Sequence, residues 1–240
     1  MEKVEVLRQY FGFPAFRAGQ QTLIDAVLSG RDALGVMPTG GGKSLCYELP
    51  ALLLPGMTLV VSPLISLMKD QVMALRNAGI PAGCINSSMS LDELRETYRD
   101  ARYGAYKLLY VAPERLLTDG FCSLAQELEI PLVAVDEAHC ISQWGQDFRP
   151  SYLKIVEFLQ RLPRRPAVAA FTATATAQVR ADIIRILQLH EPETVVTGFD
   201  RPNLRFEVLR PKDKRTALLQ LLSERRDKSG IVYCATRKTV

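Results

Sequence analysis

The chain has 240 residues, a hydrophobic content of 48% and a formal net charge of +4 at pH 7. These values are typical of a globular protein with one large domain and the beginning of a second. No run of eighteen apolar residues occurs, and the N-terminus lacks the basic-then-apolar order of a signal peptide. The sequence therefore predicts an intracellular protein without a membrane span. Its mild positive charge permits a nucleic-acid-binding face without requiring one.

The five cysteines are scattered along the chain and never form a C-x-x-C pair. This spacing indicates neither a disulfide framework nor a zinc site, so buried, reduced thiols are expected. Only two histidines are present, which argues against a metal centre built from histidines. The residues concerned are Cys46, Cys84, Cys122, Cys140, Cys234, His139 and His190.

An aromatic turn between two predicted helices occupies the first 30 residues. Apolar residues recur at helical spacing over residues 23–28, and Ser29-Gly30 stops the run. Upstream, Phe13, Arg17 and Gln20 place a ring, a guanidinium and an amide in one short segment. This combination suits stacking on, and hydrogen bonding to, an adenine. The alternative is an aromatic residue that packs into the core.

Residues 37–44 read as a phosphate-binding loop between a strand and a helix. Three glycines allow several backbone N–H groups to converge on one anion, and the helix that follows adds its positive dipole end. Lys43 would reach the phosphates and Ser44 would hold magnesium. Met37 stands where the strict pattern has glycine, and a plain glycine turn is the alternative. The candidate nucleotide-binding residues are Thr39, Gly40, Gly41, Gly42, Lys43 and Ser44.

Strands and helices alternate along most of the chain. Strands are predicted at residues 34–36, 59–64, 82–86, 107–111, 131–135 and 167–171, and helices at 66–72, 91–102, 151–162 and 178–187. This alternation predicts an α/β fold in which helices flank a mostly parallel sheet. Ligands gather at the carboxyl ends of such strands, so the polar residues that follow them should share one edge.

The most apolar of these strands, residues 131–135, runs directly into Asp136 and Glu137. Two carboxylates at the end of a buried strand are costly unless a cation or catalysis compensates. In a nucleotide hydrolase Asp136 would hold magnesium, and Glu137 would orient and deprotonate the attacking water. The alternative is a helix N-terminus that uses acids to complement its dipole.

Two further segments follow strand ends or the acidic pair. Trp144, Phe148 and Arg149 lie in an irregular stretch suited to stacking on single-stranded bases, with Arg149 on a phosphate. A tryptophan that anchors the loop to the core is the alternative. Thr172 and Thr174 could relay contacts between the phosphate site and the outer edge, or the Thr-Ala-Thr segment could cap the next helix.

The regular alternation weakens after residue 189. A strand is predicted at 204–208, a charged helix at 214–227 and a fresh strand at 231–234. One strand and one helix cannot bury their apolar faces, so this part is expected to be the cut-off start of a second α/β domain. The predicted domains are residues 1–198 and 199–240.

The motifs together resemble the RecQ family of superfamily 2 DNA helicases, of bacterial type, over essentially the whole chain. The matching segments are residues 13–20 (motif 0), 37–44 (motif I), 62–71 (motif Ia), 112–115 (motif Ib), 136–139 (motif II), 144–150 (aromatic-rich loop), 172–174 (motif III), 199–203 (segment joining the domains) and 231–237 (start of motif IV). The resemblance implies a RecA-like P-loop domain followed by the truncated start of a second one.

The resemblance implies an ATPase that uses ATP and Mg²⁺, with no zinc site in this chain. Phe13 would stack on adenine beside Arg17 and Gln20, and the catalytic residues would be Lys43, Asp136 and Glu137. Ser44 and Asp136 would hold Mg²⁺. A further set of residues would contact DNA or couple DNA binding to hydrolysis. They are Ser62, Lys69, Arg115, His139, Trp144, Phe148, Arg149, Thr172 and Thr174.

The family also implies a place and partners. The expected activity is helicase translocation from 3' to 5' in DNA repair and recombination, on single strands and duplex junctions. The expected protein is a monomer in the bacterial cytoplasm, at the nucleoid, without membrane contact, and single-strand-binding protein is a candidate partner. Two residues depart from the family pattern: Ala18 replaces a proline and Gln146 a histidine.

Family members continue through a second RecA-like domain that supplies arginine fingers, which contribute roughly three to five orders of magnitude in rate. The chain alone is therefore expected to bind nucleotide, to hydrolyse it poorly and not to unwind DNA. A nucleotide- or DNA-binding module with little or no catalysis is the alternative. A P-loop kinase or metabolic ATPase explains less, because it assigns no role to the Trp144 and Thr172 segments.

Overall fold

The computed structural model describes residues 2–198, 204–234 and 236. The chain forms two compact units, Met1–Phe199 and Asp200–Val240, and each is described by itself. The first unit contains eight α-helices among its described residues: α1 (Lys3–Phe11), α2 (Gln20–Leu28), α3 (Leu45–Leu53), α4 (Ile65–Asn77), α5 (Leu91–Arg102), α6 (Asp119–Glu127), α7 (Lys154–Arg161) and α8 (Ala177–Ile186). Three short 3-10 helices are η1 (Pro113–Arg115), η2 (Ala138–Ile141) and η3 (Pro150–Leu153).

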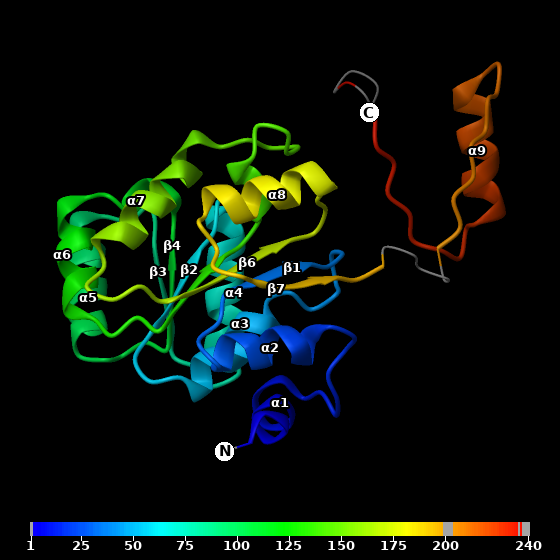
Figure 1. Ribbon diagram of the computed structural model, residues 1–240. Coiled ribbons are helices and arrows are strands. Elements are labelled where there is room, and N and C mark those ends of the chain that lie inside the picture. The colour runs from blue at the N-terminus through cyan, green and yellow to red at the C-terminus, as the bar shows by residue number, and fades with distance from the viewer. Residues whose placement is uncertain (1, 199–203, 235, 237–240) are drawn as a thin grey trace. The chain divides into compact units, whose positions relative to one another are not determined.

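The strands of the first unit form one sheet (Figure 1). They are β1 (Ala33–Val36), β2 (Thr58–Val61), β3 (Ala82–Ile85), β4 (Leu108–Val111), β5 (Leu132–Val135), β6 (Ala167–Thr172) and β7 (Glu193–Val196), in the spatial order β3-β4-β2-β5-β6-β1-β7. All six strand pairings are parallel. This confirms the predicted parallel sheet with flanking helices. It also brings the ends of β1, β5 and β6 together in the middle of one edge.

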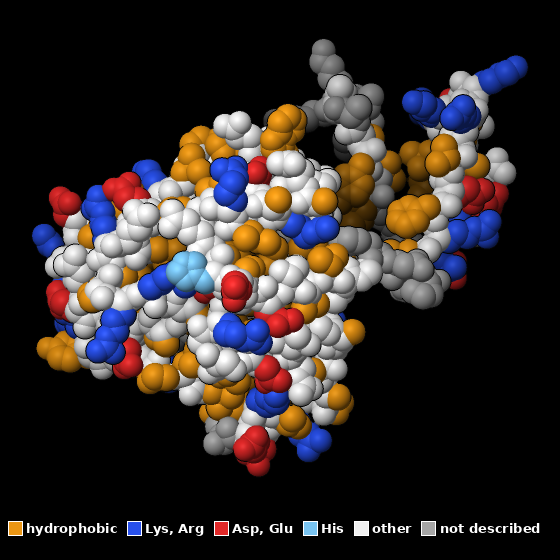
Figure 2. Space-filling view, viewed as in Figure 1, with side chains coloured by type: hydrophobic (Ala, Val, Ile, Leu, Met, Phe, Trp, Pro, Cys, Tyr) orange, Lys and Arg blue, Asp and Glu red, His pale blue; other side chains and the backbone are white. Residues whose placement is uncertain are grey.

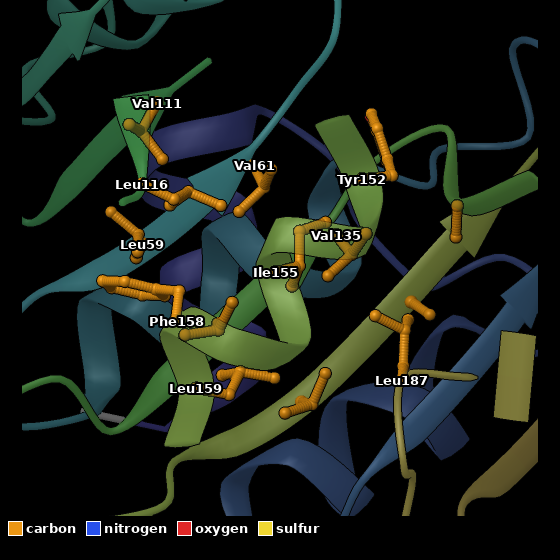
Figure 3. Packing of buried hydrophobic residues seen from close by; sticks show 14 of the residues in the cluster. Leu59, Val61, Val111, Leu116, Val135, Tyr152, Ile155, Phe158, Leu159 and Leu187 are labelled. Atoms are coloured by element: carbon orange, nitrogen blue, oxygen red, sulfur yellow. The ribbon is translucent and has the colours of Figure 1, made fainter. Parts of the chain in front are cut away.

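Helices cover both faces of the sheet, so the side chains of β1, β2, β4, β5 and β6 are buried whichever way they point. On one face Leu59, Val61 and Val135 pack with residues of α5, α6, α7 and α8. Figure 3 shows this layer, in which Ile155 and Phe158 of α7 lie against the strands. On the other face the intervening strand residues pack with α2, α3 and α4. The two layers fix the sheet and leave its carboxyl edge for the site.

Local sequence signals account for several helix boundaries. α5 begins with a capping box, in which Ser90 and Glu93 satisfy each other's backbone N–H groups. α8 begins where the Thr176 side chain accepts a hydrogen bond from Val179 N at 3.3 Å. The capping alternative for the threonine segment is therefore correct at Thr176.

Asp32 ties together the amino ends of three strands, opposite the polar edge. Its carboxylate pairs with the Arg165 guanidinium, with oxygen–nitrogen distances of 2.6 and 3.1 Å. It also accepts hydrogen bonds from Val168 N at 2.8 Å and His190 N at 2.7 Å. The side chain is almost fully buried, so these partners satisfy a charge that water cannot reach.

Two predictions of strands were wrong, and one strand and one α-helix were missed. Residues 204–208 and 231–234 form no strand, because the described part of the second unit offers no strand to pair with and their side chains are exposed. β7 was missed since its short Thr-Val-Val run directly follows Glu-Pro-Glu, which reads as connecting chain. α6 was not predicted either.

The described part of the second unit contains one helix, α9 (Lys214–Glu224), which confirms the predicted charged helix. α9 buries none of its residues. Phe206 is 90% exposed and Tyr233 is 89% exposed, and hydrophobic side chains gather on the surface of this part (Figure 2). The described residues thus do not show the start of a second sheet domain. The predicted joining segment, 199–203, and part of motif IV lie outside the described residues.

No helix among the described residues has the length and apolar character needed to cross a membrane.

Candidate nucleotide-binding site

The predicted phosphate loop connects the end of β1 to the beginning of α3. Gly40 and Gly42 have φ angles of 78° and 83°, in the left-handed region that glycine tolerates best. Met37, the departure from the strict motif, is 1% exposed, and its N–H donates to Thr172 O at 3.0 Å. Its side chain therefore belongs to the core, and the substitution leaves the glycines free to shape the loop.

The predicted adenine segment touches the phosphate loop directly. The Arg17 guanidinium donates a hydrogen bond to Gly40 O and lies 5.9 Å from the centroid of the Phe13 ring. Gln20 Nε2 donates to Gly42 O at 3.1 Å, and Gln20 Oε1 accepts from Arg17 N at 2.7 Å. Phe13 is 46% exposed, which leaves a ring face for stacking. The core-packing alternative for Phe13 is thus wrong.

Gly42 is required for a second, steric reason. A Cβ atom built on Gly42 would lie 2.2 Å from Gln20 Nε2. The absence of a side chain therefore allows the Gln20 amide to reach the loop. Together, Gln20 and Gly42 join the segment expected to bind adenine to the segment expected to bind phosphate.

The acidic pair follows β5, next to the loop. Asp136 is buried, and its Oδ1 accepts a hydrogen bond from Glu137 N at 2.9 Å. Burial and the neighbouring charge of Glu137 raise the pKa of Asp136 to about 6. Glu137 itself has a φ of 46°, an uncommon backbone conformation for a residue with a side chain. A hydrogen bond from His139 lowers the pKa of the Glu137 carboxyl, so this group is ionised at neutral pH.

One cleft of about 410 Å³ contains most of the predicted nucleotide site. Its lining includes Lys43 and Ser44 from the loop together with both acidic residues. Lys43 Nζ donates to Met37 O at 3.3 Å, within the loop. The cleft is lined by Phe13, Ala15, Arg17, Gln20, Thr39, Gly40, Gly42, Lys43, Ser44, Leu45, Leu67, Gln71, Asp136 and Glu137. Sequence reasoning assigned no role to Leu67 and Gln71, although their spacing of four residues would place them on one face of a helix.

His139 connects the acidic pair to the threonine segment. Its Nδ1 lies 2.9 Å from Thr172 Oγ1 and 3.3 Å from Glu137 Oε2. The Thr172 hydroxyl donates its proton to Thr174 O at 3.1 Å, so it accepts the hydrogen bond from His139. Contacts with the Cys140 sulfur and with the Glu137 carboxylate raise the pKa of His139.

The aromatic loop, residues 142–149, leaves this region between η2 and η3. Its first residue is anchored, since Ser142 Oγ donates to Asp182 Oδ2 at 2.7 Å and accepts from Trp144 N at 3.1 Å. The Trp144 side chain is nevertheless 75% exposed. The alternative in which Trp144 anchors the loop to the core is therefore wrong.

Phe148 and Arg149 are less exposed than Trp144. The Arg149 guanidinium is already engaged, with hydrogen bonds to Asp147 Oδ2 at 2.7 and 2.9 Å and to Pro63 O at 2.9 Å. A phosphate at Arg149 would compete with Asp147. The predicted phosphate contact of Arg149 stays a prediction.

The remaining predicted DNA residues are dispersed. Ser62 is fully buried at the end of β2, so its side chain offers no surface to a ligand. Lys69 is exposed on α4, where it lines a separate hollow between α4 and α5. Arg115 is half-buried in η1. The structure does not gather these three residues at the nucleotide cleft, and their roles stay predictions.

The residues of the cleft fit a magnesium–nucleotide complex. Mg²⁺ is usually held by one or two carboxylates together with substrate phosphates and water, and Ser44 and Asp136 supply one hydroxyl and one carboxylate. In the part of the chain that the structure describes, no group of three or more His, Cys, Asp or Glu side chains could hold a metal ion alone. A nucleotide would therefore bring much of the metal's coordination with it.

Comparisons with known protein sequences agree with this geometry. A family model described as DEAD/DEAH box helicase matches residues 17–183. The ATP-dependent DNA helicase RecQ of Bacillus subtilis (strain 168) is 49% identical over 234 residues, which cover 97% of this chain and 40% of that protein. RecQ of Pasteurella multocida (strain Pm70) is 45% identical over 237 residues, which cover 99% of this chain and 37% of that protein. The chain thus spans about two fifths of the length of these curated relatives.

Solved structures share the fold. A hypothetical ATP-dependent RNA helicase from Sulfolobus tokodaii aligns with a TM-score of 0.62 at 22% identity, over 80% of this chain and 56% of that one. The DUF1998 helicase MrfA aligns with a TM-score of 0.76 at 18% identity, over 100% of this chain and 39% of that one. MrfA bound to DNA aligns with a TM-score of 0.64 at 16% identity, over 82% of this chain and 29% of that one.

The family model covers more than half of the chain, and the similarity to RecQ helicases extends over nearly all of it, which confirms the resemblance inferred from the motifs. This chain belongs to the DEAD/DEAH box helicase family.

Proposed function

We propose that this chain is the nucleotide-binding motor domain of a RecQ-type, ATP-dependent DNA helicase. The observation that carries the proposal is the convergence of Lys43, Ser44, Asp136 and Glu137 on one cleft. His139 links this cleft to the threonine segment, and the aromatic loop with its exposed Trp144 begins three residues after His139. An enzyme that couples nucleotide hydrolysis to a second ligand needs both a hydrolytic cleft and a separate surface that binds this ligand.

Different residues of the cleft have different roles in the proposed hydrolysis. Lys43 carries a positive charge toward the phosphates, and the loop N–H groups and the start of α3 orient them. Bound magnesium would neutralise charge that develops on the transferred phosphoryl group. Glu137 is ionised at neutral pH, so it can orient a water molecule and accept its proton.

Single-stranded DNA is the proposed outer ligand. An exposed tryptophan on an anchored loop provides a stacking face for any base. A nucleobase stacked on Trp144 would contact the aromatic loop directly. The first residue of this loop, Ser142, is three residues from His139. Hydrogen bonds of His139 with Thr172 and Glu137 then extend to the catalytic carboxylate.

The resemblance to RecQ helicases supports the finer parts of the proposal. They are translocation from 3' to 5', activity on single strands and duplex junctions in repair and recombination, and dependence on Mg²⁺. We also propose a monomer at the bacterial nucleoid, with single-strand-binding protein as a partner. The domain boundary near residue 199 and the DNA or coupling roles of the residues named above belong to the same proposal.

Phosphate release by the full-length gene product that contains this chain tests the proposal. We expect Mg²⁺-dependent ATP hydrolysis that single-stranded DNA stimulates. Glu137→Gln should slow hydrolysis about a hundredfold or more while nucleotide still binds, because general-base catalysis contributes roughly 10²–10⁴-fold. A matched control is Glu114→Gln in η1, which lies outside the lining of the cleft.

Three results would contradict the proposal: no stimulation by DNA, unchanged turnover of Glu137→Gln, or phosphate transfer to a small molecule. The 240-residue chain by itself should bind a fluorescent ATP analogue and release phosphate poorly. Binding without any stimulated release by the full-length product would instead indicate a nucleotide-binding module.

A further inference from the structure

Helix α4 presents different residues to two hollows. Leu67 and Gln71, one helical turn apart, line the nucleotide cleft. Lys69, Met73 and Arg76 line the hollow between α4 and α5. The face of α4 that contains Gln71 is thus part of the nucleotide site, although the motifs that describe the phosphate loop and acidic pair do not include it.

The Gln71 amide oxygen is buried without a hydrogen-bond partner among the described residues. Three other buried side-chain oxygens in the described chain share this condition: Tyr47 Oη, Thr58 Oγ1 and Ser62 Oγ. Those three belong to side chains that are at most 1% exposed, within the core. Of the four residues, only Gln71 lines the nucleotide cleft. A buried acceptor without a donor is unfavourable, so a donor supplied by a bound ligand would stabilise the complex.

The topology places the start of α4 beside the acidic pair. β2 and β5 are neighbours, and Asp136 N donates to Val61 O at 2.9 Å. α4 begins four residues after β2 ends, so it leaves the sheet edge next to Asp136. The adenine segment, by contrast, is joined to the phosphate loop at Gly40 and Gly42. Because α4 leaves the edge next to Asp136 and Gln71 lines the cleft together with Asp136 and Glu137, we assign the face of α4 with Gln71 to the metal and phosphate end of the cleft.

The chemistry of that end restricts the donor. An amide oxygen only accepts hydrogen bonds, and ionised phosphate oxygens also only accept. Lys43 Nζ donates to Met37 O and not to Gln71 Oε1, which has no donor among the described residues. Water molecules bound to Mg²⁺ are donors, and Mg²⁺ usually keeps several of them.

We propose that Gln71 is a positioning residue of this site, whose Oε1 accepts a hydrogen bond from a water molecule coordinated to the nucleotide-bound Mg²⁺. The role rests on the proposed function, because it requires a magnesium–nucleotide complex in the cleft. Such outer-shell hydrogen bonds orient metal ligands and contribute to metal affinity. The amide acts through the water and does not touch the phosphates.

Equilibrium titration of the full-length product with a fluorescent, non-hydrolysable ATP analogue tests this role, once in excess Mg²⁺ and once in EDTA. Gln71→Met keeps the length of the side chain and removes its polar atoms. We expect about five- to tenfold weaker binding in Mg²⁺ and unchanged binding in EDTA, as for one lost hydrogen bond. Gln71→Asn, which draws the amide back by one methylene, should show the same selective loss.

Gln71→Glu keeps an acceptor oxygen at this position, so its Mg²⁺-dependent affinity should match or exceed that of the unmodified protein. Gln9→Met, the same change at an exposed position of α1, is the matched control and should have no effect. Circular dichroism melts of each variant establish that it is folded.

Equal losses in Mg²⁺ and EDTA, or no loss in Gln71→Met and Gln71→Asn, would overturn the role of Gln71. Weaker binding by Gln71→Glu than by Gln71→Met would also overturn it, because the amide nitrogen would then be donating to a phosphate. If the unmodified protein binds no nucleotide, the proposed function itself fails. If the unmodified protein binds nucleotide in a Mg²⁺-dependent way and the Gln71 variants bind it with the same affinity, the role of Gln71 is contradicted and the proposed function is not.

Discussion

The nucleotide cleft and the aromatic loop lie at the same edge of one sheet, yet they are held in different ways. In the cleft, Arg17 and Gln20 donate to the carbonyl groups of Gly40 and Gly42, so the segments expected to bind adenine and phosphate are already joined. In the aromatic loop, the backbone is anchored while Trp144 faces solvent. The cleft is organised before ligand binds, whereas the loop keeps its contact surface free. Substitutions should therefore separate nucleotide chemistry from the response to DNA.

Lys43→Ala should have the largest effect and should leave the aromatic loop intact. Loss of one charged group that stabilises the transition state slows catalysis about a thousandfold, so phosphate release should fall by about that factor. Affinity for single-stranded DNA, measured without nucleotide by fluorescence anisotropy, should stay within about twofold. A large loss of DNA affinity would show that the two regions are not separable.

Asp136→Asn should stabilise the metal-free protein, because the cleft buries a carboxylate without its cation. Folding raises the pKa of Asp136 from 3.8 to about 6, so the ionised form destabilises the folded state. This penalty is fully present above about pH 6 and disappears below the unfolded value of 3.8. Removing the charge should therefore raise the free energy of unfolding by about 3 kcal/mol at pH 8 and by about half of that at pH 5.

Thermal melts in EDTA at pH 8 and pH 5 measure this gain. Asp147→Asn, at an exposed carboxylate of the aromatic loop, is the matched control and should give no such gain. A gain that does not shrink at pH 5 would contradict the proposed cause. We therefore expect the buried carboxylate of Asp136 to lower the free energy of unfolding of the metal-free protein, and the exposed carboxylate of Asp147 to leave it unchanged.

Trp144→Ala should change the response to DNA and leave the cleft unaffected. Stacking of one base on an aromatic ring is worth about 1–3 kcal/mol, so affinity for single-stranded DNA should fall about tenfold. Affinity for the ATP analogue should not change, and Trp144→Phe should recover much of the DNA affinity. Equal loss of both affinities would indicate that the ring supports the fold.

Thr172→Val should give the smallest effect, and it tests the connection between the two regions. The substitution removes the hydroxyl that accepts a hydrogen bond from His139, in a fully buried position. We expect the stimulation of hydrolysis by DNA to fall about threefold, while both affinities change little. Thr22→Val, at an exposed side chain of α2 that lines no part of the cleft, is the control. Stimulation that equals that of the unmodified protein would remove His139–Thr172 from the coupling path.

Much of the cleft could be predicted from sequence because its parts are local backbone patterns. The glycines before Lys43 and the two acids after an apolar strand are recognisable wherever they occur in this order. Parallel pairing then brings them together, since strands β1, β6 and β5 are consecutive in the sheet. Gln71 was missed as a cleft residue because its role depends on the direction of α4, which no short pattern specifies.

Errors occurred where a strand depends on its neighbours. β7 carries only Thr194, Val195 and Val196 as a strand signal, but β1 offers an open side to pair with. Residues 204–208 carry a similar apolar signal and form no strand, because the described part of the second unit contains no strand for them to pair with. Exposure of Trp144 was also undecidable from sequence, since a lone tryptophan suits both a core and a ligand surface.

The Asp32 cluster has a consequence for how variants of this protein can be used. It binds Arg165, Val168 N and His190 N at the amino ends of the strands, away from every residue of the cleft. Weakening it would lower the melting temperature without altering a ligand contact. Substitution of Asp32 should therefore give a temperature-sensitive variant, which is folded and active at low temperature and unfolds at a higher one.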